Sequence, residues 1–452
     1  MEPGVTHLAD VVVVGAGIGG MSAALEARAA GATVLVLEAT ETVGGNAARS
    51  SGYLAFADFA RQRDQEIEDS PEAFARDMEA EVDRRRAAFG IDYDEELAML
   101  FARRSADGYE FLSRLGIPFG RFVSRPLQHS VTRLVSILDA EDFHTCFECA
   151  LDRAGISVIL RARVRRLLVE AGRVVGVEWE ATGDEGRRAA RARRAVILAA
   201  GGFQANHELR LHYQPQHLAF TPYPGLDTCR GDGHLMGQAI GGELINMTMI
   251  PTLVRTASAL IEDAIAVDAA GRRFHDEAGP YFDRVEALTS RAGGRAHYVF
   301  DARTEGRLRE VIAAAVPTQP VGAPTLSTLA ETIGCDAAGL EGSVRRWNEF
   351  LTTDRDRDPE FGRVVLPADR DGINVPPFYA APLMLAASLT AGGFRVSNHM
   401  EVAHVDGSII PGLFAVGDCV GGVNPAAGVG GIHLSSAVVL GRVAGRAAAG
   451  AS

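Results

Sequence analysis

The feature that most constrains the fold is an N-terminal stretch in which a buried strand runs directly into a glycine-rich turn and then a helix. Residues 11–14 are four consecutive valines, which is typical of a parallel strand buried on both faces. The turn GAGIGG follows at 15–20, and residues 21–30 have a helical pattern. A second buried strand at 33–37 completes a right-handed βαβ unit. The sequence therefore predicts an α/β protein with a Rossmann-like domain.

The spacing of the glycines predicts a dinucleotide site at this turn. Gly15 allows the tight turn, Gly17 allows a pyrophosphate to approach the backbone, and Gly20 allows the strand and helix to pack closely. The following helix N-terminus presents free N–H groups and the positive end of its dipole to phosphates. Glu38, at the end of the second strand, can accept hydrogen bonds from ribose hydroxyls.

Two further stretches favour FAD over NAD as the dinucleotide. After Glu38 comes a segment of small and polar residues where a flavin ring can approach the backbone; its candidate contacts are Gly45, Asn46, Ser51 and Gly52. Near the other end of the chain, the strand 412–416 ends at Gly417-Asp418, and glycines at 428, 430 and 431 precede a helix. An acid at position 418 can bind the ribityl chain, and the second helix N-terminus can stabilise negative charge on the flavin.

Composition excludes several other classes of function. The chain has 452 residues, a net charge of −13 and 45 basic residues, all of them arginine, so lysine chemistry and a nucleic-acid footprint are not expected. Five scattered cysteines do not form a disulfide pattern and predict a reducing compartment. Neither a signal peptide nor a long apolar run appears, so we expect a cytoplasmic protein without a membrane span.

The Gly/Val-rich character at both ends of the chain predicts a discontinuous first domain with an α+β insertion. We place the FAD-binding domain at 1–245 and 392–452, and the insertion at 246–391. Residues 61–115 have helical periodicity and are predicted to form surface helices. The arginine-rich segment 183–194 is predicted to be a solvated loop between strands. The C-x-x-C pair Cys146 and Cys149 is interpreted as part of a helix.

The sequence resembles the fumarate reductase/succinate dehydrogenase flavoprotein superfamily, closest to the branch of 3-ketosteroid dehydrogenases and related FAD-dependent desaturases. The matching stretches follow the order of the family through nearly the whole chain: GAGIGG, GGNAARSSG, AVILAAGGF, CRGDGHLMGQAIGG, GRRFHDE and PGLFAVGDCVGG. The resemblance implies that the insertion caps the reactive face of the flavin. It also implies cofactor contacts from Val164, Ala199, Asp232, His433 and Leu434.

The family's dicarboxylate chemistry is not matched. By resemblance, the proton-donor arginine of fumarate reductases falls on Tyr281, the histidine at the cap edge falls on Leu389, and the C-terminal clamp arginine falls on Gly428. These departures make fumarate a poor candidate substrate. The histidine that carries covalent flavin has no counterpart before Gly44, so we expect noncovalent FAD.

Tyr281 matches the tyrosine that helps take the substrate proton in the ketosteroid dehydrogenase branch. Desaturation beside a carbonyl requires that a base remove the acidic α-hydrogen while the β-hydrogen leaves as hydride. A phenol needs a neighbouring positive charge to act as that base, and Arg284 is close in sequence. The alternative, that Tyr281 only packs within the insertion, stays open.

Other candidate substrate contacts follow from position. Tyr53 comes after the flavin-facing Ser51 and Gly52, and His129 and Arg133 lie in a loop that often lines the active site in the family. The tyrosine that binds the keto oxygen in the ketosteroid branch is missing, so Asn424 is the candidate donor, next to Gly428.

Three functions remain open from sequence. The first is an FAD-dependent dehydrogenase that desaturates a small-molecule carbonyl substrate such as a cyclic ketone or oxo-acid. The second is an ene-reductase acting on an activated alkene, and the third is a redox-sensing or assembly flavoprotein without turnover. A second glycine motif after a strand is missing from the sequence, so we expect reoxidation by an external acceptor: a quinone, a carrier protein or oxygen.

Overall fold

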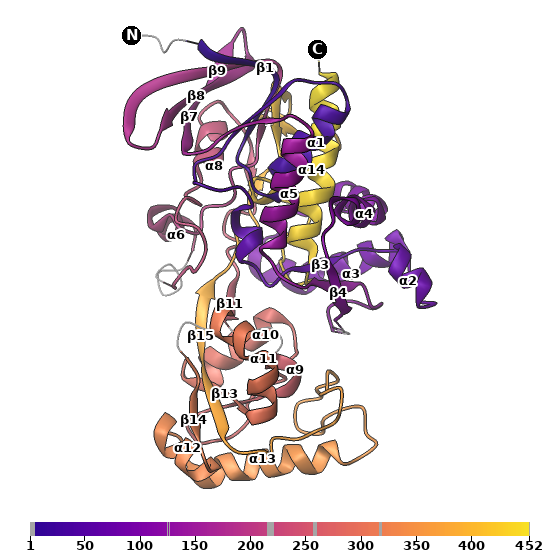
Figure 1. Ribbon diagram of the computed structural model, residues 1–452, viewed down its shortest axis with the longest axis vertical. Helices are drawn as coiled ribbons and strands as arrows, with labels where there is room; N and C mark the ends of the chain where they lie inside the picture. Colours follow the sequence, from indigo (N-terminus) through magenta and orange to yellow (C-terminus); the bar gives the residue numbers. More distant parts are fainter. Residues whose placement is uncertain are drawn as a thin grey trace. The chain divides into compact units, whose positions relative to one another are not determined.

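The computed structural model describes residues 5–451, apart from 124, 126, 215–220, 256–259 and 316–318. The chain divides into two compact units (Figure 1). Unit 1 comprises Met1–Val123, Gln128–Pro251 and Ser388–Ser452, and unit 2 comprises Ser124–Leu127 and Thr252–Ala387. The role of unit 2 as a cap over the flavin stays a prediction. Within the described residues, no helix is both long and apolar enough to cross a membrane.

Unit 1 is built on a mixed sheet in which β1 (Val5–Val14) is central. β1 pairs in parallel with β2 (Val34–Leu37) on one side and with β9 (Asp184–Leu198) on the other. The strand order is β17-β18-β9-β1-β2-β6, and β8 pairs with β9 and β7. The remaining strands of this sheet are β6 (Ser157–Ile159), β7 (Ala162–Glu170), β8 (Arg173–Ala181), β17 (Glu401–Ala403) and β18 (Ile409–Ala415). The predicted α/β class is confirmed.

Two helices from opposite ends of unit 1 lie side by side, α1 (Ile18–Ala29) and α14 (Ile432–Gly450) (Figure 1). Their backbones come so close that a Cβ on Gly441 would collide with the Gly19 carbonyl. Glu26 of α1 also binds two arginines of α14, with Arg442 at 3.0 Å and Arg446 at 2.6 Å. The first and last helices are therefore packed as one layer.

The predicted helices between 61 and 115 are confirmed as α2 (Ala60–Asp64), α3 (Pro71–Phe89) and α4 (Glu95–Leu115). Ser70 caps α3 and Asp94 caps α4, each through a side-chain oxygen that accepts a backbone N–H.

The C-x-x-C pair lies in α5 (Asp142–Arg153), as predicted, with free thiols. The described residues contain no group of three or more His, Cys, Asp or Glu side chains that could hold a metal ion.

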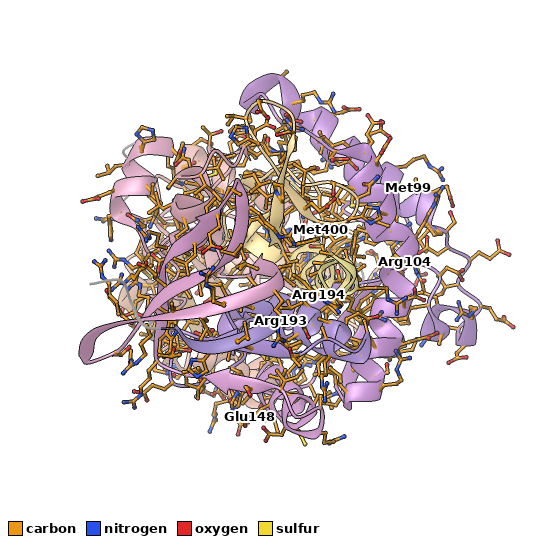
Figure 2. The ribbon with its side chains drawn as sticks, turned by 90° about the horizontal axis from the view of Figure 1, so that it is seen from above. Met99, Arg104, Glu148, Arg193, Arg194 and Met400 are labelled. Atoms are coloured by element: carbon orange, nitrogen blue, oxygen red, sulfur yellow. The ribbon has the colours of Figure 1, made fainter. Side chains whose placement is uncertain are left out.

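The arginine-rich segment is not a loop, so that prediction was wrong. β9 runs without a break through this segment to Leu198, and Figure 2 shows Arg193 and Arg194 on it. Small alanines between the arginines are buried, while the arginines are bound by neighbours: Arg193 lies 3.4 Å from Asp10, and Arg194 donates to the Ala449 carbonyl. Because the charges are paired, the run is compatible with a strand.

Smaller elements complete unit 1. The strands β3, β5 and β4 form a three-stranded sheet, and β10 pairs with β16. The bounds are η1 (Gly45–Arg49), β3 (Tyr53–Ala55), β4 (Phe119–Phe122), β5 (Leu134–Ile137), α6 (His207–Tyr213), α8 (Asp232–Gln238), β10 (Leu244–Ile245), β16 (Gly393–Phe394) and η3 (Gly417–Cys419).

Unit 2 is an antiparallel sheet with helices, in the order β11-β15-β13-β12 with β14 on β15. Its strands are β11 (Thr252–Arg255), β12 (Ile265–Val267), β13 (Ala296–Asp301), β14 (Val321–Ala323) and β15 (Phe378–Ala387). Its helices are α9 (Leu260–Asp263), α10 (Tyr281–Glu286), η2 (Ala287–Arg291), α11 (Ala302–Ala315), α12 (Leu326–Ile333) and α13 (Ala337–Leu351).

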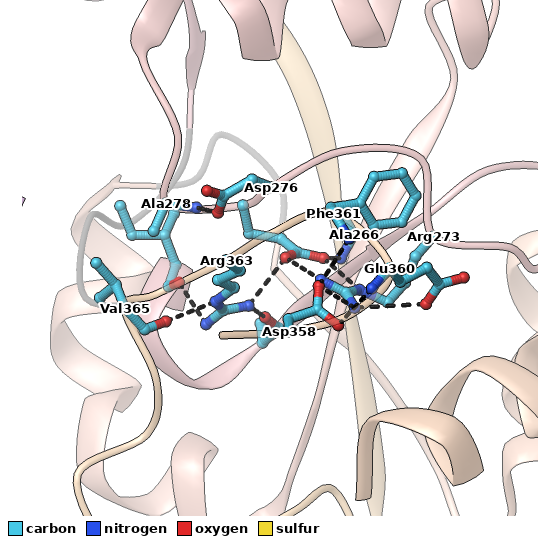
Figure 3. A network of polar contacts seen from close by, with 12 residues as sticks. Ala266, Arg273, Asp276, Ala278, Asp358, Glu360, Phe361, Arg363 and Val365 are labelled. Atoms are coloured by element: carbon cyan, nitrogen blue, oxygen red, sulfur yellow. Dashed lines mark hydrogen bonds and ion pairs between the residues drawn. The ribbon is translucent and has the colours of Figure 1, made fainter. Parts of the chain in front are cut away.

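A buried ionic network fixes the loop after α13 to this sheet (Figure 3). Glu277 is fully buried and binds Arg273 at 2.8 Å and Arg363 at 3.0 Å. The two guanidinium groups lie on the ring of Trp347, at 4.8 and 4.7 Å from its centroid. Arg273 also reaches Asp358 at 3.1 Å. The two cations hold the pKa of Glu277 well below its usual range, against the opposing effect of burial.

We expect Glu277→Gln to lower the free energy of unfolding by about 3 kcal/mol, because it leaves two buried arginines without their shared carboxylate. Denaturant unfolding followed by circular dichroism measures the change. The matched control is Glu349→Gln, which breaks an exposed pair with Arg345 and is expected to have no resolvable effect. Equal stability of the two variants would contradict a central role for the network.

Candidate functional site

The glycine turn between β1 and α1 has two glycines required by packing and one that faces open space. Gly15 has φ +106°, and a Cβ there would collide with the Ala199 carbonyl. A Cβ on Gly20 would collide with the Gly15 carbonyl. A Cβ on Gly17, by contrast, would meet no described atom within 4 Å. The N-terminus of α1 is therefore open at Gly17, where a phosphate can approach.

Glu38 is buried beside this turn. One carboxylate oxygen accepts the Ala16 N–H at 2.6 Å, and the other accepts the backbone N–H and the hydroxyl of Thr40 at 2.8 and 2.9 Å. These bonds hold the carboxylate at the carboxyl ends of β1 and β2. A carboxylate has about four acceptor positions. The Glu38 carboxylate can therefore accept a hydrogen bond from a ribose hydroxyl in addition to those from Ala16 and Thr40.

The Gly44-Gly45 segment lies directly against the turn. The Gly44 N–H donates to the Ala16 carbonyl at 2.9 Å, and a Cβ on Gly45 would lie 3.1 Å from the Gly17 Cα atom. Asn46 follows, and its amide holds a second segment in place: it donates to Tyr223 Oη at 2.6 Å and accepts the Leu226 N–H at 3.0 Å.

The predicted flavin-facing residues lie at the start of β3. Gly52 has φ +65°, and its carbonyl accepts the Ile137 N–H at 3.0 Å. Ser51 is exposed, and Tyr53 is half-buried and pairs with Ser136 of β5.

A cavity in unit 1 brings the predicted C-terminal residues together. Asp418, His433 and Asn424 all border it; the full lining is Thr390, Ala391, Gly417, Asp418, Val420, Val423, Asn424, His433, Ser436 and Leu440. Gln204 Nε2 donates to Asp418 at 3.2 Å, and enclosure of the Asp418 carboxyl raises its pKa to about 6. Burial lowers the pKa of His433 to about 4, so its imidazole is neutral at pH 7.

The glycine-rich turn after Asn424 is held by side chains from distant parts of unit 1. His129 Nε2 donates to the Gly430 carbonyl at 3.0 Å, and Gln128 Oε1 accepts the Gly430 N–H at 3.2 Å. Glu81 of α3 fills the space next to Gly428, where a Cβ would collide with the Glu81 carboxylate. Glu81 is itself buried and paired with Arg84 and, at 3.3 Å, with Arg85.

Arg133 lies beside this turn but is already engaged. It is fully buried, its Nε donates to Asp69 at 2.7 Å, and its Nη1 donates to Asp77 of α3. Its guanidinium also lies 4.9 Å from the centroid of Phe74. In this geometry Arg133 ties α3 to β5, and its guanidinium is occupied by protein carboxylates.

The cofactor contacts implied by resemblance lie in three places. Ala199 follows β9 and its N–H donates to the Val14 carbonyl at 2.8 Å, next to Gly15. Asp232 begins α8 and binds Arg163 through two hydrogen bonds of 2.8 and 3.0 Å. Val164 is buried in β7, and Leu434 is in the first turn of α14.

The predicted catalytic pair lies in unit 2. Tyr281 begins α10 and is half-buried, whereas Arg284, one helical turn later, is buried. The guanidinium carbon of Arg284 lies 5.0 Å from the centroid of the Tyr281 ring. The two predicted side chains are therefore in contact.

Sequence reasoning missed three residues of unit 1. Gln204 directly follows the matched stretch AVILAAGGF, and Thr390 precedes the glycines 392 and 393, so both carried a positional signal. Glu81 lies in a helix rich in charged residues, and only its contact with Gly428 distinguishes it.

Comparison with known proteins agrees with this geometry. The family model described as an FAD binding domain matches residues 10–434. Urocanate reductase of Eggerthella lenta is 30% identical over 99% of this chain and 75% of its own length. The open conformation of a flavocytochrome c3 fumarate reductase gives a TM-score of 0.78 at 25% identity, covering 99% of this chain and 79% of that one. The 3-ketosteroid-Δ4-(5α)-dehydrogenase of Rhodococcus jostii RHA1 gives 0.75 at 26%, covering 99% and 98%.

Gly17→Val should release the cofactor without unfolding the protein, because its side chain would enter only the open space beside α1. The visible flavin absorbance per protein measures retained FAD, and the thermal midpoint of the apo-protein measures the fold. Gly306→Val is the control, since a Cβ there also meets no described atom but lies on α11. Full flavin content in Gly17→Val would place the phosphates elsewhere.

The described residues fit FAD. The open turn at Gly17 and the carboxylate of Glu38 suit the pyrophosphate and the ribose. In the C-terminal cavity, His433 Nε2 and Thr390 Oγ1 have no hydrogen-bond partner among the described residues, so the cavity offers polar atoms to a ligand. Together with the family match over most of its length, this shows that the chain belongs to the FAD-binding flavoprotein family of the fumarate reductases and ketosteroid dehydrogenases, with FAD as its cofactor.

Proposed function

We propose that this FAD-dependent oxidoreductase is a dehydrogenase that desaturates the carbon pair beside a carbonyl group, in a cyclic ketone or an oxo-acid. Tyr281 receives the α-proton of the substrate, and Arg284 supports it. FAD, when bound, supplies the acceptor for the hydride that leaves the neighbouring carbon. Asn424, in the glycine-rich turn of unit 1, is the candidate donor to the substrate carbonyl oxygen.

The observation that carries the proposal is the contact between Tyr281 and Arg284. A guanidinium 5.0 Å from the ring centroid stabilises negative charge on a phenol that gives up its proton. Arg284 is buried, so water screens its charge less than it would at the surface. A base of this kind suits the weakly acidic hydrogen beside a carbonyl group.

The surroundings of Gly428 favour the neutral cyclic ketone over the oxo-acid, which carries a carboxylate at neutral pH. By resemblance, fumarate reductases have a clamp arginine at this position for a substrate carboxylate. Here the residue is glycine, and the neighbouring space is filled by the Glu81 carboxylate. Arg133, the other candidate cation near this turn, is already bound by Asp69 and Asp77.

The second candidate function is an ene-reductase acting on an activated alkene. It is favoured by the reductase relatives, which match nearly the whole chain. In either direction we propose that electrons are exchanged with an external partner: a quinone, a carrier protein or oxygen.

Anaerobic mixing of the holoenzyme with candidate substrates separates the two directions. Loss of the visible flavin absorbance on addition of cyclohexanone or 5α-androstane-3,17-dione supports the dehydrogenase. Reoxidation of the photoreduced flavin by cyclohexenone, urocanate or fumarate, without any bleaching by the ketones, would support the reductase instead.

Tyr281→Phe is expected to slow flavin bleaching by the active ketone about 100-fold or more, because the variant has no oxygen to receive the α-proton. FAD content should not change. Stopped-flow absorbance measures the rate, and Tyr379→Phe, a tyrosine of β15 that stacks on Phe300, is the matched control. Bleaching at the wild-type rate in Tyr281→Phe would remove this residue as the base.

Gly428→Arg is expected to destabilise the protein, because its Cβ would collide with Glu81. Adding Glu81→Ala should restore most of the thermal midpoint and create a cationic site for a carboxylate. We expect fumarate to perturb the flavin spectrum of the double variant and not that of the wild type. A single Gly428→Arg variant as stable as the wild type would show that Glu81 does not fill this space.

A further inference from the structure

Helix α5 carries two neighbouring cysteines, Cys146 and Cys149, that differ in their exposure. Cys149 is exposed, whereas Cys146 is half-buried against the core of unit 1, and both thiols are free. Residues three apart on a helix are neighbours, with about 5–6 Å between their Cβ atoms. Burial raises the pKa of the Cys146 thiol, with smaller contributions from Asp142 and Cys149. One sulfur of the pair is therefore open to small reagents in solvent, and the second lies beside it.

The exposed sulfur has a cationic neighbour one helical turn later. Arg153 Nη2 donates to Cys149 Sγ at 3.0 Å. A cysteine sulfur attacks a peroxide as the thiolate, so a guanidinium in contact with the sulfur favours that reaction. Redox-active cysteines are typically exposed, lie near a cation and have a second cysteine within reach. Cys149 meets all three conditions, with Cys146 as the second cysteine.

Helix α5 packs on the segment that borders the dinucleotide turn. His144 Nδ1, near the start of the helix, donates to the Val43 carbonyl at 3.0 Å. A Cβ on Gly44 would lie 3.3 Å from the His144 Cβ and 3.4 Å from its Cα, so the helix and this segment are closely packed. The Gly44 N–H in turn donates to the Ala16 carbonyl at 2.9 Å. Two successive contacts therefore connect α5 to the turn that FAD phosphates approach.

A disulfide between Cys146 and Cys149 does not fit an undistorted helix. It needs its Cβ atoms about 3.5–4.5 Å apart, closer than the spacing of residues three apart on a helix. Just beyond its C-terminal end, α5 is held to the neighbouring α1 (Figure 1), where Arg28 Nε donates to the Ala154 carbonyl at 3.1 Å. Closing the disulfide deforms the helix between this attachment and His144. The contact of His144 with the Val43-Gly44 segment is therefore strained.

We propose that Cys149 and Cys146 form a peroxide-sensitive modification site, and that their oxidation to a disulfide weakens the binding of FAD. The oxidant is hydrogen peroxide, which forms when oxygen reoxidises a reduced flavin. The Cys149 sulfur attacks one peroxide oxygen: an S–O bond forms, the O–O bond breaks, and the released hydroxide takes up a proton to become water. The Cys146 sulfur then attacks Cys149: an S–S bond forms, the S–O bond breaks, and the Cys146 proton leaves in a second water. The two thiols lose two electrons, and the peroxide gains them.

The test treats reduced holoenzyme with a small molar excess of hydrogen peroxide. The intact mass should fall by that of two hydrogen atoms, and peptide mapping should place the disulfide between Cys146 and Cys149. We expect the dissociation constant of FAD, from flavin fluorescence on dilution, to rise about tenfold or more, because the disulfide strains the helix. Dithiothreitol should restore the original value. A disulfide that leaves the dissociation constant unchanged overturns the effect on the cofactor.

Two variants separate the roles of the two sulfurs. Cys149→Ser should keep its FAD affinity through the peroxide treatment, and Cys146→Ser should stop at a sulfenic acid that dimedone captures. Cys335→Ser, which changes a half-buried thiol of unit 2, is the matched control and should respond as the wild type does. Chains joined to one another through Cys149, or a Cys149→Ser variant that loses FAD like the wild type, would overturn the paired site.

The route from the disulfide to the cofactor is tested at His144. His144→Ala removes the hydrogen bond to Val43, so the dissociation constants of FAD for its reduced and oxidised forms should differ by no more than about threefold. The full wild-type difference in this variant would overturn the route through His144. None of these measurements involves a substrate, so their outcome is independent of the direction in which the flavin reaction runs.

Discussion

The close backbone approach between the first glycine turn and the end of β9 is the contact on which the rest of unit 1 depends. Gly15 allows it, because any Cβ would collide with the Ala199 carbonyl. With this contact in place, the carboxyl ends of β1, β2 and β9 meet at one edge, where Glu38, Gly17 and Gly45 surround the same open space. Binding at the carboxyl ends of parallel strands follows from the geometry of this class of sheet.

The second half of the site depends on long-range packing within unit 1. Residues 417–433 reach the sheet because α14 packs along α1, fixed by Glu26 and its two arginines. The turn before α14 is held from outside the sheet by His129, Gln128 and Glu81. The residues that shape this turn are therefore helix and loop residues far away in sequence.

Much of this arrangement could be predicted from the sequence, for identifiable physical reasons. The valine run, the glycine turn and Glu38 are local signals, and Arg284 is expected beside Tyr281 because it is close in sequence. The arginine-rich strand was predicted wrongly, because a charge run looks solvated unless the carboxylates that pair with it are known. The contact between Glu81 and Gly428 could not be predicted, since it joins two segments without any shared pattern.

The packing of α1 against α14 has a consequence for the order in which the protein folds. β1 and α1 are made before unit 2, but their partner helix is made after all of unit 2. Nearly all of unit 2, by contrast, is one continuous segment, Thr252–Ala387, that can fold once it has left the ribosome. The buried face of α1 therefore lacks its partner until α14 has been made, so unit 1 is completed only after unit 2 has been synthesised.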